Sequence, residues 1–170
     1  MPGMEIRTAQ REEYEAVGEL TATAYLADRL VRDEYLPLLR DAAARAKAGE
    51  LLVAVDGETG ELLGTASLFR ASAGPDWAEG AADGDAVLRM LAVSAGMRRC
   101  GLGQALTMEC IRRARDIGCR RLILSTGPTM TAARGLYEGL GFRRDPDGDW
   151  EPLSGVPLLA YWLPLQPDAC

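Results

Sequence analysis

The sequence predicts a mixed α/β domain in which one sheet is covered by helices on both of its faces. Short apolar runs of strand length alternate along the chain with longer segments whose apolar residues recur at the helical spacing. Their order is one strand, two helices, three strands, a helix, a strand, a helix and one or two closing strands. No internal repeat or change of composition divides the chain, so we expect residues 1–170 to form a single domain.

The first three elements are a strand and two helices. Residues Met4–Thr8 alternate between apolar and polar side chains, which is typical of a half-buried strand. Residues Glu12–Tyr25 carry apolar side chains at helical spacing and acidic ones in the first turn, where the helix dipole favours negative charge. The segment Val31–Ala48 is rich in Ala, Leu and Arg, and we expect Pro37 to kink or restart a helix there.

A hairpin and a loop come next. The apolar runs Leu51–Val55 and Leu62–Phe69 are separated by residues 56–61, whose Asp, Gly, Glu and Thr composition indicates a turn between two antiparallel strands. Residues Ala71–Gly84 are dense in Gly, Ala and Asp and show no periodicity. We therefore expect a surface loop near a site in this segment.

Strands and helices alternate in the second half of the chain. Strands are expected at Ala86–Val93, Arg121–Ser125 and Leu158–Leu163, and helices at Leu102–Ile117 and Thr131–Leu140. Gly141 follows the second of these helices and is a residue type that commonly ends helices. The acidic residues between positions 145 and 151 are interrupted by Pro and Gly, which indicates an exposed turn before the last strand.

The composition excludes several classes of function. Apolar residues make up 48% of the chain and charged residues 26%, which is typical of a globular protein, and the net charge of −6 disfavours nucleic acid as a partner. The chain has no histidine and no C-x-x-C pair, so catalytic triads are excluded and no metal site is expected. Neither a signal peptide nor a membrane-spanning run is visible, so we expect a cytoplasmic protein without a membrane partner.

The most informative segment follows the strand Ala86–Val93. There, Arg98, Arg99, Cys100, Gly101, Leu102 and Gly103 precede a helix without any spacer. Glycines allow close approach of a ligand, and the first amide groups of a helix have no internal acceptors, so this turn suits a pyrophosphate. Taken alone, such glycines between a strand and a helix are more often explained by the geometry of the turn than by a ligand. The nucleotide-binding patterns G-x-x-x-x-G-K-[ST] and G-x-G-x-x-G are absent, and what remains is R-x-x-G-x-G.

A second motif lies downstream of the first. In the segment from Ala132 to Arg144, residues Ala133, Leu136, Tyr137, Gly141 and Phe142 follow the pattern A-x-x-L-Y-x-x-x-G-F. With the R-x-x-G-x-G turn at the expected distance, the chain resembles the GNAT (GCN5-related N-acetyltransferase) superfamily, most clearly between Asp85 and Phe142. The resemblance implies a GNAT-type mixed, mostly antiparallel sheet of six to seven strands with helices on both faces.

The resemblance also implies an activity and the residues that carry it. Members transfer the acetyl group of acetyl-CoA to a primary amine, here of a small molecule or a peptide, by direct attack in a ternary complex. Tyr137 would protonate the departing thiolate as general acid, although a packed aromatic ring is the alternative explanation. The backbone near Leu91 would donate to the oxyanion. Cofactor-binding residues would be Leu91, Ala92 and Val93 along the pantetheine arm, Arg98, Arg99, Cys100, Gly101, Leu102, Gly103 and Gln104 at the pyrophosphate, and Met130 and Ala133.

The chain departs from the family pattern at two positions. Many relatives carry a glutamate base where this chain has Val87, so Asp85, or else Asp83 or Glu79, would have to replace it, although each is also explained as an ordinary solvated carboxylate. Met130 stands where relatives often carry asparagine. The alternative function is therefore a catalytically weak acyl-CoA-binding regulatory module.

Similar proteins often form dimers through their C-terminal strands. The last predicted strand carries four large apolar side chains that would allow such a homodimer here, namely Leu158, Leu159, Trp162 and Leu163.

Overall fold

The computed structural model describes residues 3–27 and 33–165 and divides into two compact units. The first unit comprises residues 1–68 and 90–110, and the second comprises residues 69–89 and 111–170. Two strands and one helix contribute residues to both units. The two units are described in turn, and the expectation of a single domain stays a prediction.

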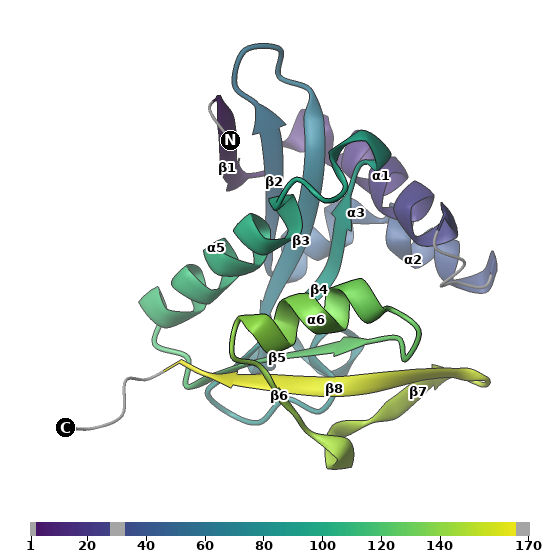
Figure 1. Cartoon of the computed structure of the whole chain (residues 1–170), viewed down its shortest axis with the longest axis vertical. Helices are drawn as coiled ribbons and strands as arrows, with labels where there is room; N and C mark the ends of the chain where they lie inside the picture. Colours follow the sequence, from purple (N-terminus) through teal and green to yellow (C-terminus); the bar gives the residue numbers. More distant parts are fainter. Residues whose placement is uncertain (1–2, 28–32, 166–170) are drawn as a thin grey trace. The chain divides into compact units, whose positions relative to one another are not determined.

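The first unit contains strands β1 to β4 in their sequence order (Figure 1). β1 pairs with β2 and β2 with β3, both antiparallel, with Ile6 opposite Ala54 and Val53 opposite Thr65. The elements of this unit are β1 (Met4–Thr8), η1 (Arg11–Glu13), α1 (Tyr14–Ala27), η2 (Asp33–Tyr35), α2 (Leu36–Arg40), α3 (Ala42–Ala48), β2 (Glu50–Asp56), most of β3 (Leu62–Arg70), the end of β4 (Asp85–Val93), η4 (Ala95–Met97) and the first turns of α5 (Leu102–Asp116).

The core of the first unit lies on both faces of its strands. On one face, Leu51, Val53 and Val55 of β2 pack against Val17 of α1 and Ala42 of α3. The opposite face packs against α5, because a Cβ atom added at Gly64 of β3 would lie 3.0 Å from Leu106 Cδ1 and 3.2 Å from Leu102 Cδ2. Successive side chains of β2 and β3 point to opposite faces of the sheet, and helices cover both faces, as predicted.

The helical region after α1 contains two short helices, α2 and α3, instead of one. Pro37 lies in the first turn of the new helix α2, where no intrahelical donor is required, so the predicted restart at this proline is confirmed. A second break, which was not predicted, falls at Asp41, whose carboxylate Oδ1 accepts a hydrogen bond of 3.1 Å from the Ala44 amide and caps α3. Val31, where we expected the helix to begin, lies outside the described residues.

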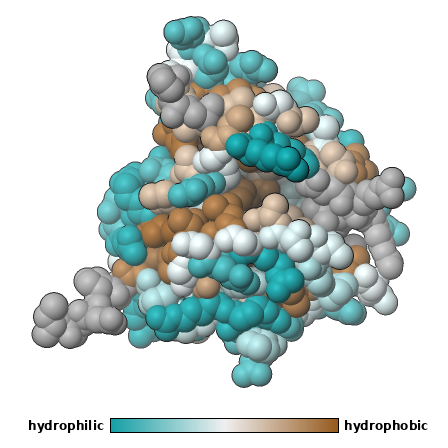
Figure 2. Space-filling model, viewed as in Figure 1, coloured by the Kyte–Doolittle hydropathy of each residue, from teal (hydrophilic) through white to brown (hydrophobic). Residues whose placement is uncertain are grey.

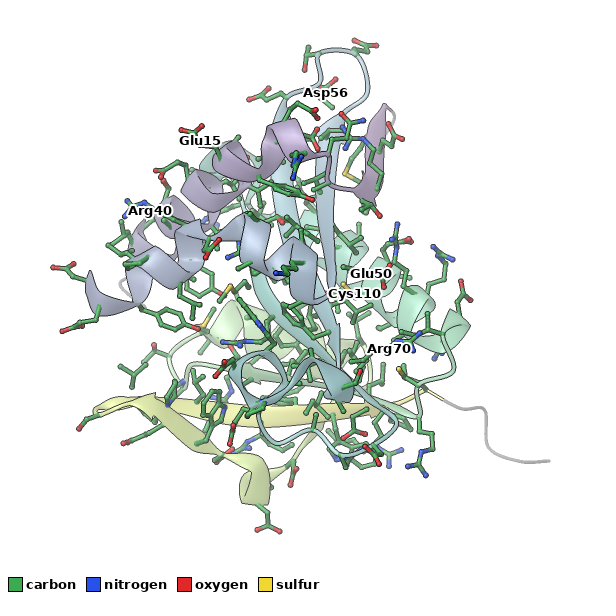
Figure 3. The ribbon with its side chains drawn as sticks, turned by 180° about the vertical axis from the view of Figure 1, so that it is seen from behind. Glu15, Arg40, Glu50, Asp56, Arg70 and Cys110 are labelled. Carbon is green, nitrogen blue, oxygen red and sulfur yellow. The ribbon has the colours of Figure 1, made fainter. Side chains whose placement is uncertain are left out.

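The predicted hairpin between β2 and β3 is confirmed. Figure 3 labels Asp56 at the end of β2, where its Oδ1 accepts hydrogen bonds from the amides of Glu58 (2.8 Å) and Thr59 (3.1 Å). The bonds from Thr59 and Glu58 lower the pKa of Asp56. Figure 2 shows hydrophilic residues at this turn, at the top of the view, as expected for an exposed β2–β3 connection.

The second unit contains the β4–β5 pair and the C-terminal strands. β4 and β5 pair in parallel over Asp85–Val87 and Arg121–Ile123, β5 pairs antiparallel with β8, and β8 also pairs with β6 and β7. The remaining elements are η3 (Ala71–Ala73), α4 (Pro75–Ala78), β5 (Arg121–Thr126), α6 (Thr131–Gly139), β6 (Arg143–Arg144), η5 (Pro146–Gly148), β7 (Trp150–Leu153) and β8 (Val156–Pro164).

The mixed, mostly antiparallel sheet that the sequence predicts is confirmed. The described residues form eight strands rather than six or seven, because β6 and β7 both pair with β8. A strand of two residues, such as β6, is too short to show an alternating pattern. The expected exposed turn is confirmed at η5, and the segment expected to be a loop contains two short helices, η3 and α4.

The described part of the chain was searched for a membrane span and a metal centre. Within residues 3–27 and 33–165, no helix is long and apolar enough to cross a membrane, and no three acidic or cysteine side chains form a group that could hold a metal ion. Cys100 is an exposed thiol, while Cys110 and Cys119 are buried thiols. Burial raises the pKa of Cys119, so this thiol stays protonated at neutral pH.

Candidate functional site

The loop between β4 and α5 begins with a short, hydrogen-bonded turn. The Ser94 amide donates to the Leu63 carbonyl at 2.9 Å, which holds the start of the loop on β3. The Met97 amide then donates to the Ser94 carbonyl at 2.9 Å and closes the single turn of η4. The backbone is extended again at Arg98, with φ of −65° and ψ of 144°. Backbone hydrogen bonds therefore fix the first residues of the loop relative to β3.

The second half of the loop has an unusual backbone conformation. Arg99 and Gly101 have positive φ values, 63° and 79°, and α5 begins immediately after them. The first intrahelical bond joins the Ala105 amide to the Gly101 carbonyl at 3.0 Å, so the amides of Leu102, Gly103 and Gln104 precede the hydrogen-bonded ladder. Such amides, with the dipole of a 15-residue helix, favour an anion at this end.

The side chains around these amides have the charge that an anion site needs. Arg98, Arg99 and Cys100 are exposed, and the Cys100 thiol lies 3.6 Å from the Arg98 carbonyl oxygen. Leu102 is buried and fixes the helix end, while Gln104 is exposed. The structure thus brings the predicted loop residues together at one helix N-terminus, and two of them are exposed arginines.

A glycine that the motif does not include determines where this helix lies. A Cβ atom at Gly64 would be 3.0 Å from the Ala92 carbonyl oxygen and equally close to Leu106 of α5. Only a residue without a side chain lets the helix and β4 approach β3 this closely. The available sequence signal was a glycine inside an otherwise apolar strand, which indicates close backbone approach.

The end of β4 contains a conformational irregularity that the sequence did not reveal. Met90 has a φ of 54° although it is not glycine, and its side chain is buried against Ala22 and Leu39. A residue in this conformation interrupts the regular ladder and redirects the backbone groups beside it, which here belong to Leu91. Ala92 is buried, while Leu91 and Val93 are half-buried. A methionine in an apolar strand gives no sequence signal for a positive φ, so the conformation of Met90 could not be predicted.

Tyr137 and Ala133 belong to the second unit, on α6. Tyr137 is 6% exposed, and its ring packs edge-on against Phe142 at a centroid distance of 5.6 Å. The Phe142 amide donates to the Tyr137 carbonyl at 3.0 Å, which closes the end of the helix. Ala133 lies one turn earlier and is half-buried. The structure thus brings these motif residues together on one helix.

Met130 lies immediately before α6, and its thioether accepts two hydrogen bonds. Its Sδ lies 3.3 Å from the Thr126 hydroxyl and 3.4 Å from the Gly127 amide. The side chain therefore closes the turn that leads from β5 into α6. A thioether is a weak acceptor, but here it accepts bonds that the side-chain oxygen of an asparagine could also accept.

Asp85 is held by an ion pair. Its Oδ1 and Oδ2 accept hydrogen bonds from Arg121 Nε (2.9 Å) and Nη2 (2.7 Å), and Oδ2 also accepts from the Ala82 amide at 2.9 Å. Burial raises the pKa of Asp85, but the bonds from Arg121 and Ala82 and the nearby guanidinium charges outweigh it, so the pKa lies below its usual value. A buried, paired carboxylate with a lowered pKa is a poor proton acceptor at neutral pH, which argues against the predicted role of Asp85 as general base.

Comparisons with known proteins agree with this geometry. The sequence pattern of the acetyltransferase (GNAT) family matches residues 7–142. A GNAT-family acetyltransferase from Staphylococcus aureus Mu50 has a TM-score of 0.73 at 18% identity and covers 96% of this chain and 99% of its own. A comparison with curated proteins finds no match.

Two further structures resemble the chain at somewhat higher identity. A Salmonella typhimurium protein, solved with its cofactor acetyl-CoA, has a TM-score of 0.68 at 24% identity, with 99% of each chain covered. A GCN5-related N-acetyltransferase from Kribbella flavida has a TM-score of 0.68 at 25% identity, with 96% of this chain and 98% of its own covered.

Proposed function

Because the chain belongs to the acetyltransferase (GNAT) family, we propose that it transfers the acetyl group of acetyl-CoA to the primary amine of a small molecule or peptide. The observation that supports this proposal most directly is the loop before α5. Its positive-φ residues Arg99 and Gly101 lead directly into the amides that open α5, and the loop carries two exposed arginines, a combination that suits a pyrophosphate.

The residues of the first unit fit the other parts of acetyl-CoA as well. The backbone of Leu91, Ala92 and Val93 would pair with the amide groups of the pantetheine arm, as an added strand would. The arm would then extend from the loop back along β4, and the thioester would lie near the irregular backbone at Met90 and Leu91. A backbone amide there would donate to the oxygen of the carbonyl under attack.

The proposed reaction has no covalent enzyme intermediate. The nitrogen of a neutral amine attacks the thioester carbonyl carbon, and the carbon–sulfur bond then breaks with its electron pair on sulfur. Tyr137 donates its hydroxyl proton to the departing thiolate, and the proton lost by the amine nitrogen restores Tyr137 through water. The products are the acetylated amine and CoA.

The proton on the incoming ammonium requires an acceptor, because alkylamines are protonated at neutral pH. Val87 is buried and supplies no carboxylate at the position where relatives carry glutamate. With Asp85 held by Arg121, the exposed loop residues Asp83 and Glu79 remain as predicted bases, acting through water. A base that acts through solvent would make turnover increase with pH as more amine becomes neutral.

The deciding experiment measures release of the CoA thiol from acetyl-CoA against polyamines, aminoglycosides, amino acids, peptides and arylamines. The control is the double variant Arg98→Ala with Gly101→Val, which alters the loop. We expect turnover with one amine class in the wild-type protein and none in the control. Saturable acetyl-CoA binding without turnover would instead support the acyl-CoA-binding module, and the absence of both would overturn the proposed cofactor site.

A further inference from the structure

A hydroxyl group of the second unit connects a strand to two side chains of α6. Tyr161 of β8 is 1% exposed. Its hydroxyl oxygen accepts a hydrogen bond of 3.1 Å from Arg134 Nε and donates one of 3.0 Å to Glu138 Oε1. Both capacities of a phenol are therefore used inside the protein, and the two partners stand on the same helix.

The two partners lie one turn apart on α6, with Tyr137 between them in sequence. At 100° per residue, positions 134, 137 and 138 fall on the same half of the helix. Arg134 also donates from Nη1 to the Pro128 carbonyl at 3.2 Å, in the turn that precedes Met130. The Tyr161 hydroxyl thus holds the helix of Tyr137 directly, and it holds the turn before Met130 through Arg134.

The Tyr161 ring is itself held in place. The guanidinium of Arg144 lies 5.7 Å from the ring centroid. Arg144 makes two hydrogen bonds of 2.7 Å to the Asp149 carboxylate, and Asp149 in turn accepts from the Ala160 amide at 2.8 Å. The cation above the ring is therefore fixed to the backbone of β8 at Ala160, directly beside Tyr161, which leaves the phenol little freedom to move.

We propose that Tyr161 is a positioning residue that sets the location of the Tyr137 hydroxyl through Arg134 and Glu138. This inference rests on the proposed function, in which Tyr137 acts as general acid. Proton transfer to a leaving group depends steeply on distance, so a small displacement of α6 slows the chemical step. Acetyl-CoA held by the loop of the first unit would still bind, because that loop contains none of these residues.

The kinetic test uses Tyr161→Phe, which removes only the hydroxyl. We expect kcat to fall by about 10- to 100-fold while the KM for acetyl-CoA stays unchanged. Ile111→Val, a methyl deletion elsewhere in the second unit, serves as a control for a general loss of stability. Glu138→Gln keeps an acceptor oxygen for the Tyr161 hydroxyl and should retain most activity, whereas Glu138→Ala should resemble Tyr161→Phe. Equal kcat values for Tyr161→Phe and Ile111→Val, assayed well below both melting temperatures, would overturn the proposal.

A second measurement does not depend on turnover and separates this proposal from the proposed function. Amide hydrogen exchange of α6 is compared between wild type, Tyr161→Phe and Ile111→Val. We expect exchange in α6 to be faster in Tyr161→Phe than in Ile111→Val by about tenfold, because a local contact is lost. Unchanged α6 exchange would refute the positioning role even if no amine were acetylated, and faster exchange would support it in that case also.

Discussion

The loop before α5 and the helix α6 both carry residues that the proposed reaction would use, but the two segments are held by different means. In the loop, the geometry is set by the backbone, since Arg99 and Gly101 adopt positive φ and the important donors are helix amides. The side chains there are exposed. In α6, by contrast, Tyr137 is buried, and the Tyr161 side chain of β8 holds its helix.

This difference indicates how each segment tolerates change. A backbone-built anion site depends on residues that can adopt a particular φ, so its sensitive positions are glycines and its arginines add strength. A side-chain-built site depends on hydrogen bonds between segments distant in sequence, and its sensitive positions are the buried polar groups. Substitutions in the loop should therefore weaken acetyl-CoA binding, whereas substitutions in α6 should lower turnover.

The largest expected effect is in α6, on turnover. Tyr137→Phe removes the proposed general acid and should lower kcat by about 100-fold or more with acetyl-CoA binding retained. The penalty should shrink with an acetyl thioester of a more acidic thiol, because that leaving group needs less help from a proton donor. Tyr14→Phe, which alters a half-buried tyrosine beside the core of the first unit, is the matched control. Full activity of Tyr137→Phe would show that Tyr137 serves only in packing, and it would refute the assignment of turnover to α6.

The next largest effect should be in the loop, on binding. Valine at position 101 would have to adopt a φ of 79°, which costs more than about 1–2 kcal/mol for a β-branched residue. Gly101→Val should therefore weaken acetyl-CoA binding by about 30- to 100-fold, as measured by titration calorimetry. Gly96→Val in the same loop is the control, since a Cβ there meets nothing within 4 Å. Equal binding by both variants would show that the backbone of the loop does not determine affinity.

A third prediction concerns the ion pair in the second unit. Asp85→Asn should lower the free energy of unfolding at pH 7 by about 2 kcal/mol, less than the roughly 3–5 kcal/mol for a fully buried pair. The smaller value is expected because Arg121 is 38% exposed and solvent screens its charge.

The same pair predicts a pH dependence with a definite sign. The pKa of Asp85 is lowered in the folded protein, so its contribution is present above the unfolded-state pKa of about 3.9 and is lost as pH falls through the folded value. In urea unfolding, the difference between wild type and Asp85→Asn should shrink between about pH 5 and pH 3. Asp83→Asn, an exposed neighbour, should behave as wild type. A pH-independent difference would mean that the charge of Asp85 contributes nothing.

Much of the fold was predictable because local patterns determine its elements. The strand Met4–Thr8 and the hairpin were predicted nearly residue for residue, since alternation and turn composition act over a few neighbours. Pro37 correctly marked the start of α2, but the second break at Asp41 was not predicted, because it depends on a carboxylate that caps α3. β6 was also missed, because its pairing with β8 depends on tertiary contact.

The candidate site was predictable to the extent that its parts lie in continuous motifs. The loop from Arg98 to Gln104 is such a motif, and its glycine pattern reflects the backbone directly. The ion pair of Asp85 could not be predicted, because its partner Arg121 is distant in sequence and meets it only through the parallel pairing of β4 with β5. Met90 and Tyr161 gave no signal, since neither the φ of a strand methionine nor the partners of a strand tyrosine can be inferred from residue type.

The smallest expected effect separates charge from geometry within the loop. Arg99 has a φ of 63°, which costs an ordinary residue about 1–2 kcal/mol, while glycine costs about 0.5–1 kcal/mol through the entropy of the unfolded chain. Arg99→Gly should therefore raise the free energy of unfolding by about 0.5 kcal/mol and weaken acetyl-CoA binding by about fivefold, the latter because one cation is lost. Arg98→Gly is the matched control, because Arg98 has an ordinary φ of −65°, so both stability and binding should fall. A loss of stability in both variants, measured by urea unfolding, would show that Arg99 is not strained and that its side chain supports the loop in another way.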